Sequence, residues 1–342
     1  MSRWVVRIIS VVLPVVFAMV PLASYGGTPT FPKMDIKVGS VMNTETPSYT
    51  GLVRWSELVK ERTGGAVNIQ IFMNALLGND NDLLQLVKTG VVHMHICGGP
   101  VLSSLGGWEP LGVFFTPFML KGDTEEEHYA AIVKVMRGPI GKEIIEKGTR
   151  DSGTRVLDTW WYGIRQTTTK TKQITKPDDV KGLKMRASDQ PIQKMSLLAL
   201  GAATTPTAMP EVYMALQMGL VEGQQNPPNT VYAFKLYEVQ KYMAMLGDMT
   251  MPLVLTINDK FFQSLSPELR DILERSAREA GEFQAKTQIA ANNKDVENLK
   301  AKGMIVNYVN RAEFAERTKD AWKTFESTFG KGLHEKVVQA LQ

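Results

Sequence analysis

The sequence predicts an α/β protein, and three alternating apolar segments with two amphipathic segments between them carry this prediction. Residues 34–41, 67–71 and 92–96 alternate apolar and polar side chains, which is typical of strands. The segments at about 50–62 and 81–88 place their apolar residues on one helical face. This strand–helix alternation favours a mainly parallel sheet covered by helices.

The following elements are shorter, apart from a helical stretch over 124–147. A strand at 156–160 and a polar loop at 167–175 follow it. Short strands are then predicted at 184–187 and 221–225. Two helices separate these strands, at 190–200 and from Pro210, because proline fits the first position of a helix.

A very long amphipathic stretch begins at Pro267 and continues to about Lys302. At 1.5 Å per residue this helix would be roughly 50 Å long, which is long enough to brace two lobes. A final helix is predicted over 313–329. We find no internal repeat and no low-complexity linker, so the lobes are predicted to be interwoven, with more than one crossing of the chain between them.

The composition is typical of a globular, soluble protein, with 342 residues, 44% hydrophobic and 22% charged. The net charge is +4 without any dense cluster of lysine and arginine, which argues against a nucleic-acid partner. Cys97 is the single cysteine, so an internal disulfide is excluded.

Residues 1–27 are predicted to be a signal peptide. Arg3 and Arg7 precede an apolar run from Ile8 to Val20, and small residues follow it. The run is shorter than the roughly 20 residues that span a bilayer, which favours a cleaved signal over an uncleaved anchor. The mature protein is therefore expected in the periplasm.

Two arginines occur in apolar, strand-like settings. Arg165 follows a run of aromatic and aliphatic residues, and Arg186 lies between Met185 and Ala187. A buried arginine needs an anionic partner, because an unpaired buried charge costs several kcal/mol. The alternatives are a solvated surface arginine in the first case and a local pair with Asp189 in the second.

Asn226 lies at the end of a predicted strand, where ligand sites of α/β sheets form, although a turn is the commonest setting for asparagine. Two guanidinium groups and an amide that converge would hold a carboxylate, because an arginine fork donates two parallel, charge-assisted hydrogen bonds.

His93, His95 and Cys97 share one face of a predicted strand and are metal-ligand types. Positions two apart on a strand are nearly 7 Å from each other, and apolar neighbours favour a buried sheet over a metal site. The sequence contains no nucleophile beside a base and no nucleotide-binding glycine motif. It therefore predicts no catalytic residues, no metal and no cofactor.

At these residues the chain resembles the periplasmic solute-binding proteins of TRAP (tripartite ATP-independent periplasmic) transporters, the DctP-type family. The resemblance covers nearly the whole mature chain. It is carried by six stretches, at 163–168, 179–186, 201–206, 211–217, 221–227 and 237–242.

The resemblance implies a fold similar to periplasmic binding proteins of type II, with two α/β lobes, mixed sheets, strand crossings and a long bracing helix. It also implies that Arg186 forms a salt bridge to the ligand carboxylate and that Arg165 and Asn226 assist. The implied organisation is a signal peptide (1–27), lobe I (34–162 plus 252–290), lobe II (163–251 plus 291–310) and a C-terminal helical segment packed across the lobes (311–342).

The chain departs from sialic-acid-binding members of this family at five positions that contact the sugar there. These positions are Val41, Gly98, Val101, Asp189 and Met209. The carboxylate anchor is kept and the polar sugar contacts are not, so the resemblance implies a smaller or more apolar organic acid.

Two further residues are candidate ligand contacts. Asp189 would receive an amine or hydroxyl, or else pair with Arg186 or cap a helix. Trp161, together with its neighbours Trp160 and Tyr162, would stack on the ligand body, or else pack in the core.

The predicted function is capture of an organic acid and its delivery to TRAP membrane permease subunits, by a monomer that is not an enzyme. The alternatives are an extracytoplasmic ligand sensor and a periplasmic enzyme acting on organic acids.

Overall fold

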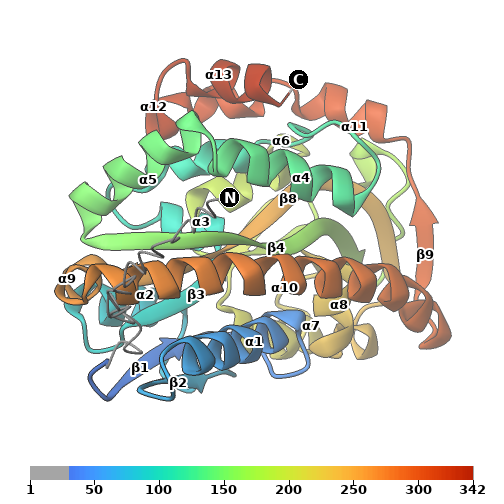
Figure 1. Ribbon diagram of the computed structural model, residues 1–342. Helices are drawn as coiled ribbons and strands as arrows, with labels where there is room; N and C mark the ends of the chain where they lie inside the picture. Colours follow the sequence, from blue (N-terminus) through green and yellow to red (C-terminus); the bar gives the residue numbers. More distant parts are fainter. Residues whose placement is uncertain (1–30, 342) are drawn as a thin grey trace, which may run out of the picture.

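The structure is a computed structural model, and it describes residues 31–341 (Figure 1). The strands within this range are β1 (Met34–Gly39), β2 (Val67–Phe72), β3 (Met94–Gly98), β4 (Thr154–Thr169), β5 (Lys184–Ala187), β6 (Ala203–Pro206), β7 (Gly223–Asn226), β8 (Tyr242–Asn258) and β9 (Ile305–Tyr308).

All these strands belong to one sheet, in the order β2-β1-β3-β8-β4-β7-β5-β6, with β9 paired to β8. The two flanks are parallel, since β1 pairs with β2 and β3 and β5 pairs with β6 and β7. The centre is antiparallel, because β8 runs against both β3 and β4. The α/β class with a mixed sheet is confirmed, and the mainly parallel sheet suggested by the strand–helix alternation is wrong at the centre.

The two central strands, β4 and β8, run through both parts of the molecule. Their pairing changes register between Trp161 and Gly163, opposite Pro252 and Met251. Gly163 has φ +131°, a conformation that other residues rarely adopt, and an added Cβ would lie 2.4 Å from Asn292 Nδ2. This irregularity falls at the lobe boundary proposed from the sequence.

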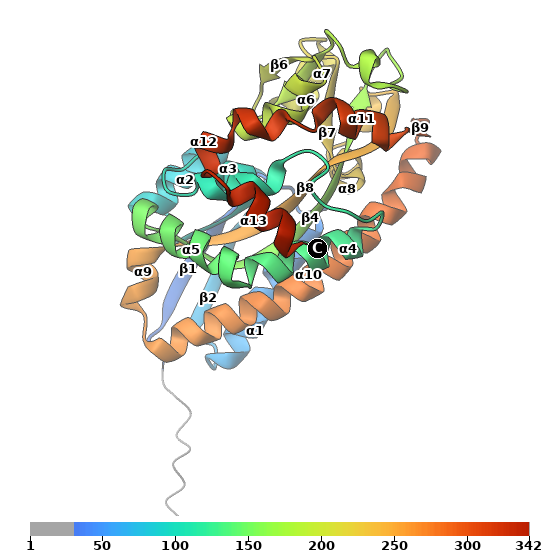
Figure 2. The same ribbon diagram turned by 90° about the horizontal axis from the view of Figure 1, so that it is seen from above.

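The helices cover the sheet on both faces (Figures 1 and 2). They are α1 (Pro47–Arg62), α2 (Asp80–Thr89), α3 (Gly99–Ser103), α4 (Glu125–Met136), α5 (Pro139–Ser152), α6 (Met195–Ala199), α7 (Val212–Gln217), α8 (Pro228–Ala233), α9 (Asp259–Ser264), α10 (Pro267–Ala301), α11 (Arg311–Thr318), α12 (Glu326–Phe329) and α13 (Leu333–Ala340).

The long helix α10 crosses the whole molecule and packs against α1, β4 and α8 (Figure 1). Its predicted length is confirmed, from the Ser266 cap to Ala301. Helices α11, α12 and α13 follow one another along one side of the molecule (Figure 2). They contact both α6 and the 109–115 segment.

Three predicted elements are wrong in extent. The stretch 124–147 is two helices, α4 and α5, because Pro139 cannot continue the first one. Strand β4 extends into the predicted loop and ends at Thr169. The predicted final helix is broken into α11 and α12.

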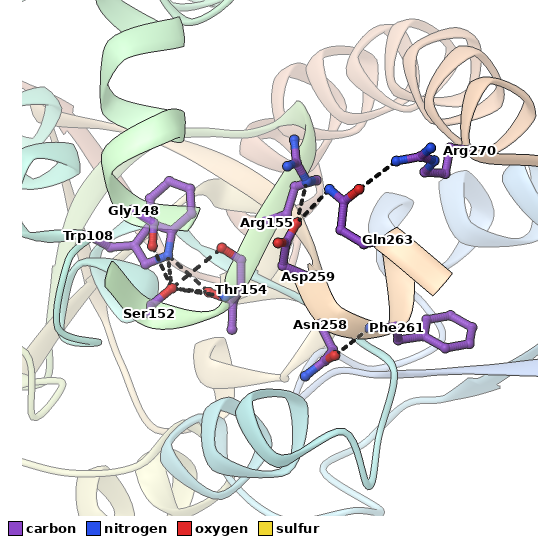
Figure 3. A network of polar contacts seen from close by, with 10 residues as sticks. All are labelled: Trp108, Gly148, Ser152, Thr154, Arg155, Asn258, Asp259, Phe261, Gln263 and Arg270. Carbon is purple, nitrogen blue, oxygen red and sulfur yellow. Dashed lines mark hydrogen bonds and ion pairs between the residues drawn. The ribbon is translucent and has the colours of Figure 1, made fainter. Parts of the chain in front are cut away.

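A buried polar cluster fixes the start of β4 (Figure 3). Ser152 Oγ donates to Gly148 O at 2.7 Å and accepts from Trp108 Nε1 at 2.8 Å. The same indole N–H lies 2.9 Å from Thr154 Oγ1. Every polar side-chain atom of this cluster is therefore paired.

The predicted signal peptide lies outside the described residues. Among residues 31–341, none of the helices combines the length and the apolar character that crossing a bilayer requires.

Candidate functional site

A cavity of about 60 Å³ lies beyond the carboxyl ends of β1, β3, β5 and β7, beside the crossing strands β4 and β8. This edge of an α/β sheet is where ligands bind in many such folds. The cavity is lined by residues from both flanks of the sheet, among them Arg165, Arg186, Asn226 and Met209. These four sequence-predicted residues therefore meet at one place, although they are spread over more than 60 positions of the chain.

Arg165 enters the cavity from β4 and is 4% exposed. Its Nη2 donates to the backbone oxygen of Gln225 on the neighbouring strand, and its Nη1 lies 3.7 Å from Met251 Sδ. In the amide orientation of Gln193 that places its side-chain oxygen toward Arg165, this oxygen lies 3.1 Å from both Nη1 and Nη2 of the arginine. Burial lowers the pKa of Arg165 to about 10, which still leaves it charged at neutral pH.

Arg186 enters from β5 and is 5% exposed. Its Nε and Nη2 both donate to Thr207 O, at 3.0 and 2.7 Å. This bond fixes the guanidinium plane. Burial, and next the nearby charge of Arg165, lower the pKa of Arg186 to about 10.

Burial excludes a solvated Arg165. Neither guanidinium forms an ion pair with a carboxylate of residues 31–341, so the local pair of Arg186 with Asp189 is excluded as well. Asp158, the nearest acidic residue to Arg165 in sequence, pairs with Arg137 at 3.1 Å. Asp189 accepts from Asn81 Nδ2 at 3.3 Å. The two buried guanidinium groups thus lack an ion-pair partner among the described residues, in a place where unpaired charge is costly.

Asn226 ends β7 and is 1% exposed. Its Oδ1 accepts from Tyr162 Oη at 3.0 Å, and its Nδ2 donates to Gln224 Oε1 at 2.6 Å. The Tyr162 hydroxyl accepts in turn from Thr230 Oγ1 at 3.0 Å. Asn226 is therefore held in a chain of side-chain hydrogen bonds at the cavity wall.

The rest of the wall is mostly apolar. Val41, Gly98, Val101 and Met209 all line it, and these are four of the five positions that the family resemblance singled out. The fifth, Asp189, lines a smaller cleft next to the cavity, which Arg186 also reaches.

Trp161 does not line the cavity. Successive residues of a strand point to opposite faces, so Tyr162 lines the cavity and Trp161 points away from it. The indole is fully buried, donates to Glu125 Oε2 at 2.5 Å and makes an edge-on contact with Tyr129.

Gln193 and Asp80 also line the cavity, and the sequence analysis did not predict them. Within the aromatic run 160–162, which the sequence offers as a stacking surface, Tyr162 is the residue that lines the cavity. Asp80 starts α2 directly after the capping residue Asn79, where an acidic residue is a common helix-start feature.

His93, His95 and Cys97 do not come together as a metal site. His93 Nδ1 accepts from Lys37 N at 3.0 Å, and Cys97 is a buried thiol whose pKa burial raises. Among residues 31–341 no group of three histidine, cysteine or acidic side chains is placed to hold a metal ion.

Comparison with known proteins defines the class. The family model described as "Bacterial extracellular solute-binding protein, family 7" matches residues 38–328, and the chain belongs to this family of solute-binding transport proteins. The C4-dicarboxylate-binding periplasmic protein of Rhodobacter capsulatus is 30% identical, over 78% of each chain.

Two further relatives agree in sequence and in fold. The 2,3-diketo-L-gulonate-binding periplasmic protein of Escherichia coli is 27% identical, over 84% of this chain and 86% of its own. The crystal structure of a sugar acid binding protein from Advenella mimigardefordensis, in complex with galactonate, superposes with a TM-score of 0.84. It is 25% identical and covers 91% of this chain and 98% of its own.

Proposed function

We propose that this protein captures an organic acid in the periplasm by its carboxylate and delivers it to a membrane permease of the TRAP type. The observation that carries the proposal is the meeting of two buried guanidinium groups, Arg165 and Arg186, in one cavity, where neither forms an ion pair with a carboxylate of residues 31–341.

The hydrogen bonds already made by the arginines determine which atoms remain for a ligand. Thr207 O takes the Nε–H and one Nη2–H of Arg186. The outer edge formed by Nη1 and Nη2 keeps donors for a two-pronged bond to a carboxylate. Arg165 keeps donors on Nη1, and Asn226 and Tyr162 form the adjoining polar wall.

The names of the relatives are consistent with such a site. They specify a C4-dicarboxylate, a diketogulonate and a galactonate, and all three are organic acids. A carboxylate is the feature that these ligands share, whereas chain length and hydroxylation differ. The apolar wall of this chain therefore adapts the same anchor to its own acid.

The position of the site supports enclosure of the ligand between two lobes. Arg186 and Asn226 belong to one flank of the sheet, and Val41, Gly98 and Val101 to the other. A ligand that touches both flanks stabilises the closed arrangement, because closure adds contacts that the open form lacks. We propose no catalytic role for these residues and a monomeric protein.

A screen of organic acids by thermal shift tests this proposal, because a ligand that binds only the folded state raises the melting temperature. Calorimetry with the best acid then compares Arg186→Ala with wild type. The expected loss is about 2–5 kcal/mol, since the buried ligand anion loses its partner.

Arg155→Ala is the matched control, because Arg155 pairs with Asp259 away from the cavity and its loss leaves binding unchanged. Near wild-type affinity in Arg186→Ala would show that the carboxylate is held elsewhere.

A further inference from the structure

The wall of the cavity carries one acidic side chain, Asp80, at the start of α2. Its side chain is 23% exposed, and it lines the cavity together with Arg186 and Tyr162. Asp80 comes from the flank of the sheet that holds β3, whereas Arg186 lies on β5 in the other flank. A ligand anchored on Arg186 therefore extends toward a carboxylate of the opposite flank.

His95, on β3, lies next to this carboxylate. The imidazole is fully buried, and its Nε2 is 3.3 Å from Asp80 Oδ1 in a geometry that makes no hydrogen bond. Within residues 31–341, Asp80 Oδ1 and both ring nitrogens of His95 are buried without a hydrogen-bond partner. The neighbouring His93, in contrast, accepts from the backbone of Lys37.

Buried polar atoms without partners are rare in folded proteins, because each one loses its bonds to water without replacement. Here three such atoms are grouped beside a ligand cavity. Two of these atoms, His95 Nε2 and Asp80 Oδ1, face each other, and only the partly exposed Asp80 side chain lines the cavity. A ligand group that donates a hydrogen bond would therefore find its acceptor in the Asp80 carboxylate, and a hydroxyl is the simplest uncharged donor of this kind.

The charges of the lining distinguish between kinds of acid. Arg165 and Arg186 are positive and Asp80 is negative, so one ligand carboxylate makes the lining neutral. A second carboxylate would face Asp80 or an apolar wall, and either position is unfavourable for an anion.

We propose that Asp80, positioned by His95, accepts a hydrogen bond from a hydroxyl group of the ligand. The protein thereby selects a small hydroxy monocarboxylate over a dicarboxylate and over the same acid without the hydroxyl. This inference rests on the proposed function and extends it to the class of acid. Asp80 contacts the ligand, and His95 acts through Asp80 by fixing where its carboxylate can lie.

Calorimetry with the mature protein and four-carbon probes tests the proposal. The probes are butanoate, its 2-, 3- and 4-hydroxy derivatives, and succinate. In wild type, at least one hydroxybutanoate is expected to bind about tenfold more tightly than butanoate, which corresponds to about 1.4 kcal/mol. It is also expected to bind more tightly than succinate.

Variants assign the preference to the two residues. Asp80→Ala is expected to bring the affinities for the hydroxy and plain acids within about twofold of each other. Asp80→Asn, which keeps the shape of the side chain, is expected to improve succinate relative to butanoate, and His95→Gln to reduce the hydroxyl preference. Glu268→Gln removes an exposed carboxylate from the first turn of α10 and is the control that changes none of these ratios.

Two outcomes separate this inference from the proposed function. If butanoate binding depends on Arg186 but wild type shows no hydroxyl preference, or Asp80→Asn, Asp80→Ala and His95→Gln all keep it, the inference is overturned and the carboxylate anchor stands. If no acid binds wild type, or Arg186→Ala binds all probes equally well, the anchor itself is refuted and this inference with it.

Discussion

Strand β4 begins in one buried polar cluster and passes through another, and the two clusters are built differently. At its start, Trp108, Ser152 and Thr154 pair all their side-chain polar atoms with one another or with the backbone (Figure 3). Further along, Arg165 is buried with its Nε lacking a partner among the described residues. Near the same cavity, Asp80 Oδ1 and both ring nitrogens of His95 also lack a hydrogen-bond partner among the described residues.

The difference separates parts of the protein that stabilise the fold from parts reserved for a ligand. A satisfied buried network adds rigidity, whereas a partly satisfied one costs stability until a partner arrives. The cavity therefore carries a cost in the ligand-free protein that the cluster at the start of β4 does not. Substitutions in the two places should accordingly change different quantities.

Arg186→Met should produce the largest change, because it replaces a buried charge with an apolar side chain of similar length. Acid binding should fall by about 2–5 kcal/mol. The free energy of unfolding of the ligand-free protein should rise by about 1 kcal/mol, since an unpaired buried charge is removed and only Thr207 O loses a donor. Calorimetry and urea unfolding measure the two effects, and a less stable ligand-free variant would contradict the comparison.

Glu125→Gln should remove a pH dependence at the junction of α4, β4 and α10. Glu125 accepts from Trp161, from the backbone of Ile164 and from Asn292, yet burial raises its pKa to about 7. The folded state thus holds a proton that the unfolded chain releases near pH 4.5, so the stability from this proton is present in acid and lost as pH rises to about 7.

The expected difference is about 3 kcal/mol between the two ends of that range. Urea unfolding of wild type and Glu125→Gln across pH 4 to 8 isolates it, because other titrating groups are common to both proteins. Parallel stability curves would show that Glu125 does not hold the proton.

The sequence predicted the anchor residues for a physical reason that does not extend to the rest of the site. A charged side chain within an apolar strand is conspicuous, and this drew attention to Arg165 and Arg186. An aspartate at a helix start is ordinary, so Asp80 was missed. Because side chains alternate along a strand, Trp161 cannot line the cavity if Tyr162 does. Which of the two faces the cavity depends on how the strand is placed in the whole sheet, and the sequence alone does not give this.

The fold shows a similar division. Helix α10 was predicted almost to the residue because its apolar periodicity is long and its Ser266 cap is clear. Strand β8 was missed, since Gly247 and Pro252 interrupt its apolar run and its partners β3 and β4 are far away in sequence. Long-range pairing of this kind leaves little trace in a local pattern.

Ser152→Ala should lower stability without affecting acid binding. The change removes a hydroxyl that bonds Gly148 O, Trp108 Nε1 and the backbone N–H of Thr154, and leaves the last of these without a partner. The expected cost is about 1–3 kcal/mol. Ser264→Ala is the control, since Ser264 is exposed and bonds only Phe261 O. An altered acid affinity in Ser152→Ala would show that the cluster at the start of β4 and the ligand cavity are energetically coupled, which would contradict the comparison.

Asp259→Asn should have the smallest effect. Asp259 Oδ1 accepts from Arg155 Nε at 2.8 Å and from Gln263 Nε2 at 3.3 Å, near the surface at the end of β8 (Figure 3). Both side chains of the ion pair keep about a quarter of their exposure, so solvent screens the pair and the expected loss is about 0.5 kcal/mol. High salt should shrink this difference in urea unfolding. If Asp259→Asn lowered the free energy of unfolding as much as Ser152→Ala, the ion pair near the surface would contribute as much to stability as the buried, uncharged polar cluster.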